Sequence, residues 1–203
     1  MERARLSKAA WVEAAFDILM ATGPDAVAVQ PLARRLGTTK GSFYWHFHTR
    51  DELLDAALVM WEEQVTDSMI ARLEAAGGPA ADQVQQLFAA VTTSARPGEL
   101  RLLNAAGQQA AGQQAGQQSP GQQAVAAAVE RVTLRRIAYV ARLLRATGLG
   151  AAAAERRARL AYAAYLGYVQ LTQSVPAALP RTPRARRALV AEMTAALVGD
   201  TSP

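Results

Sequence analysis

The chain has 203 residues, of which 51% are hydrophobic, so it is long enough to bury one substantial core or two small ones. Its formal net charge of +5 at pH 7 and its pI of about 10.1 favour an acidic partner, and nucleic acid is the commonest one. Because the chain has no cysteine, disulfides and thiolate metal sites are excluded.

The N-terminal segment does not have the pattern of a targeting sequence. Charged residues begin the chain, and Glu13 and Asp17 interrupt its first apolar stretch. The longest uncharged segment, residues 102–129, contains so much Gln and Gly that it is too polar to span a membrane. We therefore expect a soluble, cytoplasmic protein with no membrane partner.

The distribution of apolar residues predicts an all-α fold of about nine helices. Alanine is abundant, apolar residues recur at spacings of three and four, and no segment keeps the alternation of a strand. Ser7 is placed to cap a first helix, which Gly23 and Pro24 end. A second helix around Leu32 is expected to end at Gly37.

Two further start signals follow in quick succession. Thr38 or Thr39 can cap a short third helix that runs to about His46. Thr49, followed three residues later by Glu52, forms a capping box that opens a long fourth helix. The sequence therefore predicts three short helices in front of a long one.

Glycine and proline divide the rest of the chain. A Gly-Gly-Pro turn at residues 77–79 is expected to close the fourth helix. Further helices are predicted over residues 80–95, 99–106, 124–147, 151–175 and 184–198. Residues 107–123 repeat Gly-Gln-Gln four times, and this low complexity favours a flexible, solvated connector.

The first three predicted helices, two of them joined by a tight glycine turn, have the form of a helix-turn-helix domain. The second helix of such a pair lies in the major groove of DNA, which gives that role to residues 39–46. Thr39, Lys40 and Ser42 carry groups that hydrogen-bond to base edges or phosphates. Gly41 lets the backbone approach the groove closely.

Charge and aromatic residues around this helix support the same interpretation. The first fifty residues carry seven Lys or Arg residues against four Asp or Glu, which suits a DNA-facing domain. Trp45 is expected to pack in the core, whereas Phe43 fits either the core or the DNA face. His46 and His48 are two apart, a spacing that does not set them side by side for a metal ion.

The segment from residue 29 to residue 47, Val-Gln-Pro-Leu-Ala-Arg-Arg-Leu-Gly-Thr-Thr-Lys-Gly-Ser-Phe-Tyr-Trp-His-Phe, resembles the signature of the TetR family of transcriptional regulators. The continuation Arg-Asp-Glu-Leu-Leu at residues 50–54 is similar to the usual opening of that family's fourth helix. Two positions depart from the family pattern. Ala28-Val29 stands where the family often has a capping Thr or Ser, and Pro31 replaces a usually polar residue.

The resemblance implies DNA contacts residue by residue. Lys40 and Ser42 fall where such proteins contact bases or nearby phosphates. Tyr44 and His46 fall at positions that touch the DNA backbone, and Arg50 matches a basic phosphate-binding position. The complete set of expected DNA-binding residues is Gln30, Thr39, Lys40, Gly41, Ser42, Tyr44, His46 and Arg50. Phe47 and Leu32 are implied to be core residues between the small helices.

We expect residues 1–50 to form the DNA-binding domain and residues 51–203 to form a helical ligand-binding and dimerisation domain. The apolar helices of the second domain, with their few tyrosines, have the composition of a small-molecule pocket, although the same residues also fit a plain core. The candidate pocket residues are Leu87, Phe88, Val91, Leu103, Tyr139, Leu143, Tyr162 and Tyr165.

The resemblance also implies that the last two long helices pair with their twins in a homodimer. Small residues at spacings of three and four in these helices allow another helix to approach closely. The candidate dimer-interface residues are Ala161, Ala164, Gly167, Tyr168, Leu171, Ala188, Leu189 and Ala195. Two reading helices about 34 Å apart suit successive major grooves of a palindrome.

Together these features predict a ligand-responsive, TetR-like repressor that binds a palindromic double-stranded DNA operator as a homodimer and is released by a small-molecule effector. The alternative is a helical ligand-binding or scaffolding protein without sequence-specific DNA binding. An enzyme is not expected, because the only two histidines lie in the DNA motif and no phosphate-binding glycine loop is present. No cofactor and no metal site are predicted.

Overall fold

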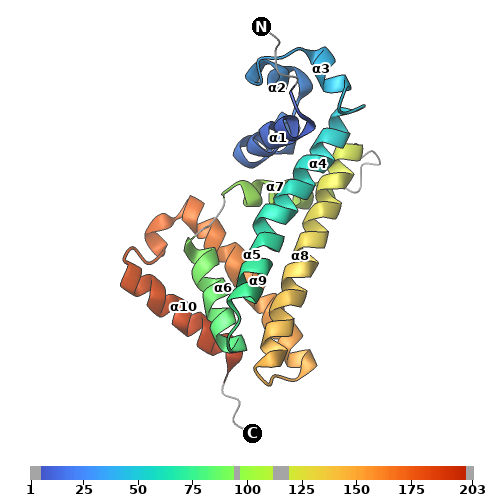
Figure 1. Ribbon diagram of the computed structural model, residues 1–203. Coiled ribbons are helices and arrows are strands. Elements are labelled where there is room, and N and C mark those ends of the chain that lie inside the picture. Colours follow the sequence, from blue (N-terminus) through green and yellow to red (C-terminus); the bar gives the residue numbers. More distant parts are fainter. Residues whose placement is uncertain (1–5, 94–96, 112–118, 200–203) are drawn as a thin grey trace. The chain divides into compact units, whose positions relative to one another are not determined.

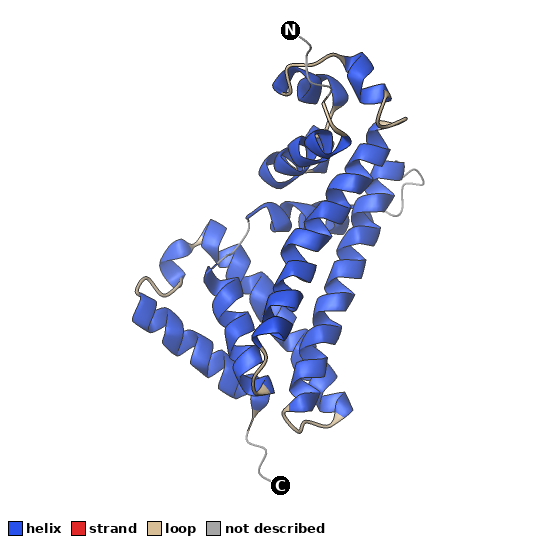
Figure 2. Ribbon diagram, viewed as in Figure 1, coloured by secondary structure: helices blue, strands red, loops and turns tan. Residues whose placement is uncertain are grey.

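A computed structural model describes residues 6–93, 97–111 and 119–199 of the chain (Figure 1). Every regular element in these residues is helical, and no strand occurs among them (Figure 2). When the continuous helix from Arg50 to Ala76 is counted once, the described residues form nine α-helices. The predicted all-α fold is confirmed.

The first helices lie close to their predicted positions. They are α1 (Lys8–Thr22), the 3₁₀ turn η1 (Pro24–Ala26), α2 (Val29–Arg35) and α3 (Lys40–Tyr44). The Ser7 hydroxyl caps α1 by accepting a hydrogen bond from the Ala10 amide at 3.2 Å. Thr39 occupies the predicted N-cap position of α3, but its side chain makes no capping hydrogen bond.

A long helical segment follows, and its backbone continues without a break from α4 (Arg50–Glu62) through the π turn η2 (Glu63–Asp67) into α5 (Ser68–Ala76). Thr49 Oγ1 accepts a hydrogen bond from the Glu52 amide at 3.1 Å, which confirms the predicted start. Glu52 Oε2 accepts from the His48 amide at 2.7 Å, one residue before the partner that a capping box ordinarily uses.

The remaining helices are α6 (Ala80–Thr93), α7 (Pro97–Ala111), α8 (Pro120–Ala146), α9 (Ala151–Ser174), η4 (Pro176–Ala178) and α10 (Pro183–Val198). The expected connector over residues 107–123 is wrong at both ends, because α7 extends to Ala111 and α8 begins at Pro120. The middle of that segment, residues 112–118, lies outside the described residues.

The early start of α8 has a local cause. The Gln122 amide donates to Ser119 Oγ at 3.3 Å, and the Ser119 amide donates to Gln122 Oε1 at 3.0 Å. Ser119 and Gln122 therefore form a reciprocal capping box, and Pro120 supplies the backbone angle that suits the first position of a helix.

The chain divides into two compact units, the first of which comprises residues 1–65 and 97–131. α7 therefore belongs to the same unit as α1–α4. Gly98 allows this packing, because a Cβ at that position would lie 2.3 Å from the Met20 carbonyl oxygen at the end of α1. Arg101 Nη1 donates to the same carbonyl at 3.0 Å.

Aromatic rings hold the first three helices around one core. Phe43 is fully buried, and the centroid of its ring lies 5.4 Å from that of Trp11 in an edge-on arrangement. On its other side the Phe43 ring stacks on Phe47 at 5.5 Å. Leu32 of α2 is also fully buried, so α1, α2 and α3 all contribute to this core. The implied core roles of Phe47 and Leu32 agree with this arrangement.

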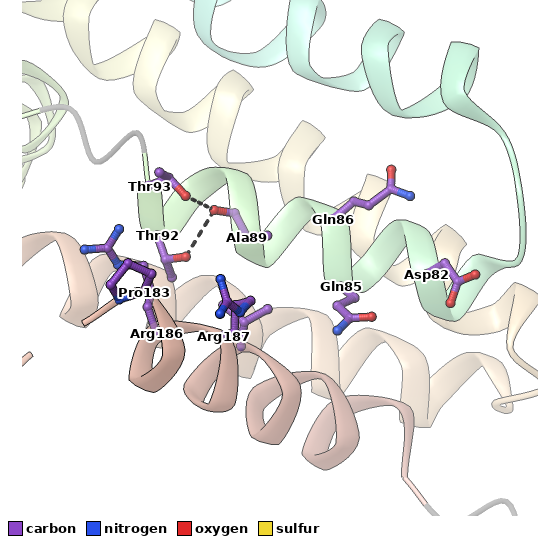
Figure 3. Close-up of a pocket in the computed structure, with 10 residues that line it drawn as sticks. Asp82, Gln85, Gln86, Ala89, Thr92, Thr93, Pro183, Arg186 and Arg187 are labelled. Atoms are coloured by element: carbon purple, nitrogen blue, oxygen red, sulfur yellow. Dashed lines mark hydrogen bonds between the residues drawn. The ribbon is translucent and has the colours of Figure 1, made fainter. Parts of the chain in front are cut away.

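The second unit comprises residues 66–96 and 132–203. Its core contains Phe88 of α6, Tyr139 and Leu143 of α8, and Ala158 of α9, all of them buried. An ion pair joins α8 to the end of η2, with Arg135 Nη2 3.0 Å from Asp67 Oδ1. A cleft of about 530 Å³ opens between α6 and α10 (Figure 3).

Two features are absent from the described residues. None of the helices combines the length and the apolar character that crossing a membrane requires. No three His, Cys, Asp or Glu side chains come close enough together to hold a metal ion.

We expect Phe43→Ala to lower the free energy of unfolding of the first unit by about 3–5 kcal/mol, because it leaves a cavity between Trp11 and Phe47. All three tryptophans belong to this unit, so tryptophan fluorescence during a urea titration reports its unfolding. Val59→Ala is the control, because Val59 is 49% exposed and its truncation should change the value by no more than about 0.5 kcal/mol. Equal effects of the two substitutions would contradict the aromatic core.

Candidate nucleic-acid interface

The turn between α2 and α3 sets the direction of the third helix. Gly37 has a φ of +63°, in the left-handed region that favours glycine. This conformation lets the Gly37 amide donate to the Arg34 carbonyl at 3.1 Å and the Thr38 amide to the Ala33 carbonyl at 2.9 Å. The last carbonyls of α2 are thereby satisfied, and the chain can turn directly into α3.

α3 has one buried side and one exposed side. Phe43 is completely buried, whereas Tyr44 is 52% exposed and Trp45, directly after the helix, is 77% exposed. Lys40 is exposed, with its Nζ 5.9 Å from the centroid of the Tyr44 ring. Thr39 is exposed at the start of the same edge. The exposed edge of α3, residues 39, 40, 44 and 45, therefore combines a hydroxyl, an ammonium group and two aromatic rings.

The expectation that Trp45 packs in the core is wrong, and helix geometry explains the error. Successive residues of a helix are about 100° apart, so a residue two positions from a buried side chain points to nearly the opposite side. Trp45 lies two positions after Phe43 and two before Phe47, both of which are buried. The same geometry settles the open choice for Phe43, which is a core residue.

Three more of the expected DNA-binding residues lie around this edge. Gln30 on α2 and Gly41 on α3 are exposed, and Ser42 is half-buried. A Cβ added at Gly41 would meet only Thr39 Oγ1, at an ordinary contact distance of 3.6 Å. Packing within the protein therefore does not require glycine at position 41.

His46 is used inside the protein. Its side chain is half-buried, and Nε2 lies 2.7 Å from the carbonyl oxygen of Leu6. Because a carbonyl can only accept, Nε2 carries the proton and donates it. This bond connects the end of the helix-turn-helix to the segment that precedes α1.

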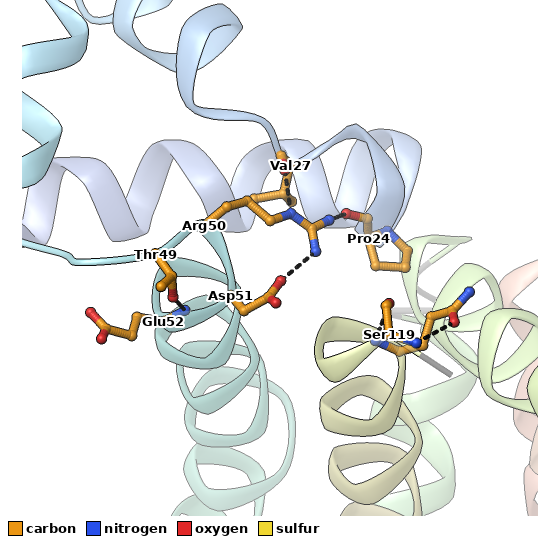
Figure 4. A network of polar contacts seen from close by, with 8 residues as sticks. Pro24, Val27, Thr49, Arg50, Asp51, Glu52 and Ser119 are labelled. Carbon is orange, nitrogen blue, oxygen red and sulfur yellow. Dashed lines mark hydrogen bonds and ion pairs between the residues drawn. The ribbon is translucent and has the colours of Figure 1, made fainter. Parts of the chain in front are cut away.

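Arg50, at the start of α4, also makes its contacts within the first unit (Figure 4). Its Nε donates to the Val27 carbonyl at 2.8 Å, one terminal nitrogen donates to the Pro24 carbonyl, and the other pairs with Asp51 Oδ1 at 3.0 Å. A Cβ at Gly121 of α8 would lie 2.6 Å from Arg50 Nη1. The guanidinium thus joins the turn after α1 to the start of α4, at a point where α8 approaches closely.

The electrostatic character of the interface comes from a few exposed cations. Lys40 and Arg34 are exposed, while the exposed Arg35 pairs with Asp17 of α1 at 2.7 Å. Exposed cationic side chains attract a phosphate backbone. Hydroxyl and aromatic groups beside them can contact sugars and base edges. The exposed edge of α3 therefore has the chemistry of a surface that binds DNA.

The expected pocket residues are divided between the two units. Leu103 is half-buried on α7 in the first unit, and the other seven belong to the second unit. Of those seven, five form or border the core of that unit: Leu87, Phe88, Val91, Tyr139 and Leu143. The pocket assignment stays a prediction, and the cleft between α6 and α10 is lined by other residues.

The tyrosines of the second unit differ in their surroundings. Tyr162 and Tyr165 are half-buried with ring centroids 6.1 Å apart, and the Tyr162 hydroxyl lies 3.0 Å from Thr133 Oγ1. The Tyr139 hydroxyl is buried without a hydrogen-bond partner among the described residues. Burial raises the pKa of Tyr139, and the nearby Glu74 carboxylate raises it further.

The expected dimer-interface residues fall into two groups. Ala161 and Tyr168 are buried inside the second unit, and the Tyr168 hydroxyl donates to the Thr92 carbonyl at 3.1 Å, so both have little surface to offer a partner chain. The other six retain surface: Ala164, Gly167, Leu171, Ala188 and Ala195 are exposed and Leu189 is half-buried. Their role in an interface stays a prediction.

The fold and the exposed edge of α3 define a helix-turn-helix protein of the kind that regulates transcription. Residues 12–57 match the family model described as bacterial regulatory proteins, tetR family. The helix-turn-helix segment of the chain is therefore of the TetR type. The tetracycline repressor protein class A from transposon 1721 of Escherichia coli is 41% identical over 59 residues, which are 29% of this chain and 27% of that repressor. The chain thus spans about a quarter of the length of the curated relatives it matches.

Solved structures share the whole fold at low sequence identity. The reduced form of Escherichia coli NemR aligns with a TM-score of 0.69 and 15% identity over 92% of this chain and 94% of NemR. A SmeT–triclosan complex aligns with a TM-score of 0.64 and 19% identity over 96% of this chain and 92% of SmeT. The arrangement of an N-terminal helix-turn-helix and a helical C-terminal part is therefore common to these proteins.

We expect Arg50→Met to lower the free energy of unfolding of the first unit by about 1–3 kcal/mol, because the Pro24 and Val27 carbonyls lose a charged donor. Tryptophan fluorescence in urea measures the change. Arg35→Met is the matched control, since it breaks only an exposed ion pair and should cost less than about 1 kcal/mol. If Arg50→Met proved no more damaging than the control, the guanidinium contacts would not stabilise this unit.

Proposed function

We propose that this protein is a ligand-responsive transcriptional repressor that binds a palindromic operator as a homodimer and leaves it when a small molecule binds the C-terminal part. The observation that carries the proposal is the exposed edge of α3, where Lys40, Tyr44 and Trp45 face outward while Phe43 anchors the helix from behind. The match of residues 12–57 to the TetR family model supports the same function. We expect the protein to act in the cytoplasm and to have no catalytic activity.

Each group on this edge has a specific use at a DNA duplex. Lys40 neutralises a phosphate, and Thr39 hydrogen-bonds to a phosphate or a base edge. The Tyr44 hydroxyl contacts the backbone, and the large apolar face of Trp45 suits a thymine methyl group. Gln30 and Ser42 extend the contact area on either side. Because Arg50 and His46 are engaged inside the protein, we propose that they position α3 rather than read DNA.

The proposed homodimer uses the exposed faces of the last two long helices. Leu160, Gly167 and Leu171 occupy one face of α9, and Val175 follows directly after the helix. The side chains of Leu160, Leu171 and Val175 are 66%, 36% and 50% exposed. Ala188 and Ala195 occupy the exposed face of α10. Apolar faces of this kind are buried when helices pair between subunits. A symmetric pair presents two copies of α3 to successive major grooves.

The proposed response to a ligand is a population shift. An effector that prefers a different arrangement of the C-terminal helices moves the two copies of α3 out of the groove spacing, and DNA affinity then falls by at most the difference in effector affinity for the two states. The unpaired Tyr139 hydroxyl is a polar group that an effector in the core could engage. That SmeT, a protein of similar fold, forms a complex with triclosan supports an organic ligand for this chain.

The DNA proposal is tested with fragments that the protein selects from its source genome. We expect Tyr44→Ala combined with Trp45→Ala to weaken binding to a selected palindrome at least tenfold in fluorescence anisotropy. We expect Lys40→Ala to reduce the slope of log K against log salt concentration by roughly one unit per protomer, because one phosphate contact is lost. Helical content measured by circular dichroism should be unchanged, because these side chains are exposed.

Arg181→Ala removes the same charge from an exposed loop of the second unit and should leave affinity nearly unchanged. A folded protein that binds no duplex would favour the alternative, a helical ligand-binding or scaffolding protein. If the Tyr44 and Trp45 substitutions left a tight, sequence-specific complex intact, the edge of α3 would not be the reading surface.

The dimer is tested by a charge on the exposed face of α9. A Cβ at Gly167 meets no atom within 4 Å, so Gly167→Glu fits the isolated chain. Glutamate also favours helix by about 0.5–1 kcal/mol over glycine. We therefore expect a stable, folded monomer in sedimentation velocity. Ala75→Glu adds the same charge at an exposed position of α5 and should remain dimeric. A Gly167→Glu protein that dimerises like the wild type would rule out this face.

A further inference from the structure

The cleft between α6 and α10 is a second site with a chemistry of its own (Figure 3). It measures about 530 Å³, which falls in the range of pockets that hold small organic molecules. α6 provides one wall and the first turns of α10 provide the other. The lining residues are Asp82, Gln85, Gln86, Ala89, Thr92, Thr93, Pro183, Arg186, Arg187 and Val190.

Two cations at one end of this cleft have no counter-charge. Within the described parts of the chain, the side chains of Arg186 and Arg187 form no ion pair and no hydrogen bond, and the Arg186 Nε is buried without an acceptor. A buried donor that is left unsatisfied costs free energy, and the cost is larger for a charged group. By contrast, other arginines of the same unit have carboxylate partners, Arg135 with Asp67 and Arg142 with Glu74.

The remaining lining groups are arranged along the length of α6. Figure 3 shows Arg186 beside the end of α6 that carries Thr92 and Thr93, Arg187 beside Ala89, and Asp82 at the opposite end of the helix. Positions 82 and 89 are seven residues apart, so at 1.5 Å per residue the acid lies ~10 Å along the helix from the level of Arg187 and farther from that of Arg186. The carboxylate of Asp82 is thus too far away to neutralise the arginines.

The rest of the lining adds hydrogen-bond acceptors near the arginines and apolar surface beside them. The Thr92 and Thr93 hydroxyls donate to carbonyls of α6, Thr92 to Phe88 at 2.7 Å and Thr93 to Ala89, so toward the cleft they offer only lone pairs. Apolar surface comes from Ala89, Pro183 and Val190. A ligand in this cleft therefore meets the guanidinium groups of Arg186 and Arg187, the threonine hydroxyl acceptors and the apolar side chains.

We propose that this cleft binds a small organic molecule through a carboxylate or phosphate group held by Arg186 and Arg187. Guanidinium groups suit both oxyanions, because their planar donors pair with two oxygens at once. The site uses none of the residues assigned to the core pocket. It also lies on the other side of α10 from the proposed dimer face, since Arg186 and Ala188 are two positions, about 200°, apart.

Isothermal titration calorimetry on the full-length protein, at constant ionic strength, tests this site without any use of DNA. The probes are benzoate, phenyl phosphate, inorganic phosphate and benzamide, the last being a neutral molecule of the same shape as benzoate. We expect benzoate or phenyl phosphate to bind and benzamide to bind at least tenfold more weakly. A preference between the two organic anions identifies the oxyanion, and tighter binding than inorganic phosphate shows that the organic body occupies the cleft.

Variants assign the binding to the two arginines. We expect Arg186→Gln with Arg187→Gln to weaken the preferred probe at least tenfold, and the exposed single variant Arg187→Gln to show a loss without any change in thermal unfolding. Arg184→Gln changes the same helix by the same charge outside the lining and should bind like the wild type. Failure of both organic anions to bind, an equal loss in Arg184→Gln, or full binding by the double variant would overturn the proposal.

Discussion

The burial of the Phe43 ring between Trp11 and Phe47 is the interaction on which the proposed DNA surface depends. α3 has only five residues, too few to be stable as an isolated helix, so its position comes from packing. Once Phe43 points inward, the 100° step of the helix leaves Tyr44 and Trp45 pointing outward. The hydrophobic core of the first unit and its exposed edge are therefore two consequences of one contact.

Two cations of the helix-turn-helix region have opposite uses. Lys40 is exposed on the edge of α3, where an ammonium group can meet phosphate. Arg50 instead satisfies the carbonyls of Pro24 and Val27 and pairs with Asp51. The close approach of Gly121 fixes the start of α8 beside this guanidinium. The basic residue at the start of α4 therefore holds the turn after α1 in place.

Local signals in the sequence predicted most of the helices because short-range hydrogen bonds decide where helices begin. Ser7 and Thr49 cap their helices as expected, and Ser119 with Gln122 offered the same signal inside a segment whose composition suggested a flexible connector. The contacts of Arg50 depend on carbonyls more than twenty residues away, and no local pattern contains that information. The 100° step of a helix predicts that Trp45 is exposed once Phe43 is buried. The sequence interpretation instead followed the general tendency of tryptophan toward burial.

The second unit shows why a list of apolar residues does not define a binding site. Phe88, Leu143 and the ring of Tyr139 pack in one hydrophobic core, so the burial of their apolar surface needs no ligand. A site is better indicated by groups whose requirements the chain itself leaves unmet, because a folded protein otherwise pairs its buried polar atoms. By that criterion the Tyr139 hydroxyl and the Arg186 guanidinium stand out, one in the core and one in the cleft between α6 and α10. A neutral hydroxyl loses less by remaining unpaired than a cation does, so the cleft has the stronger physical reason to bind a partner.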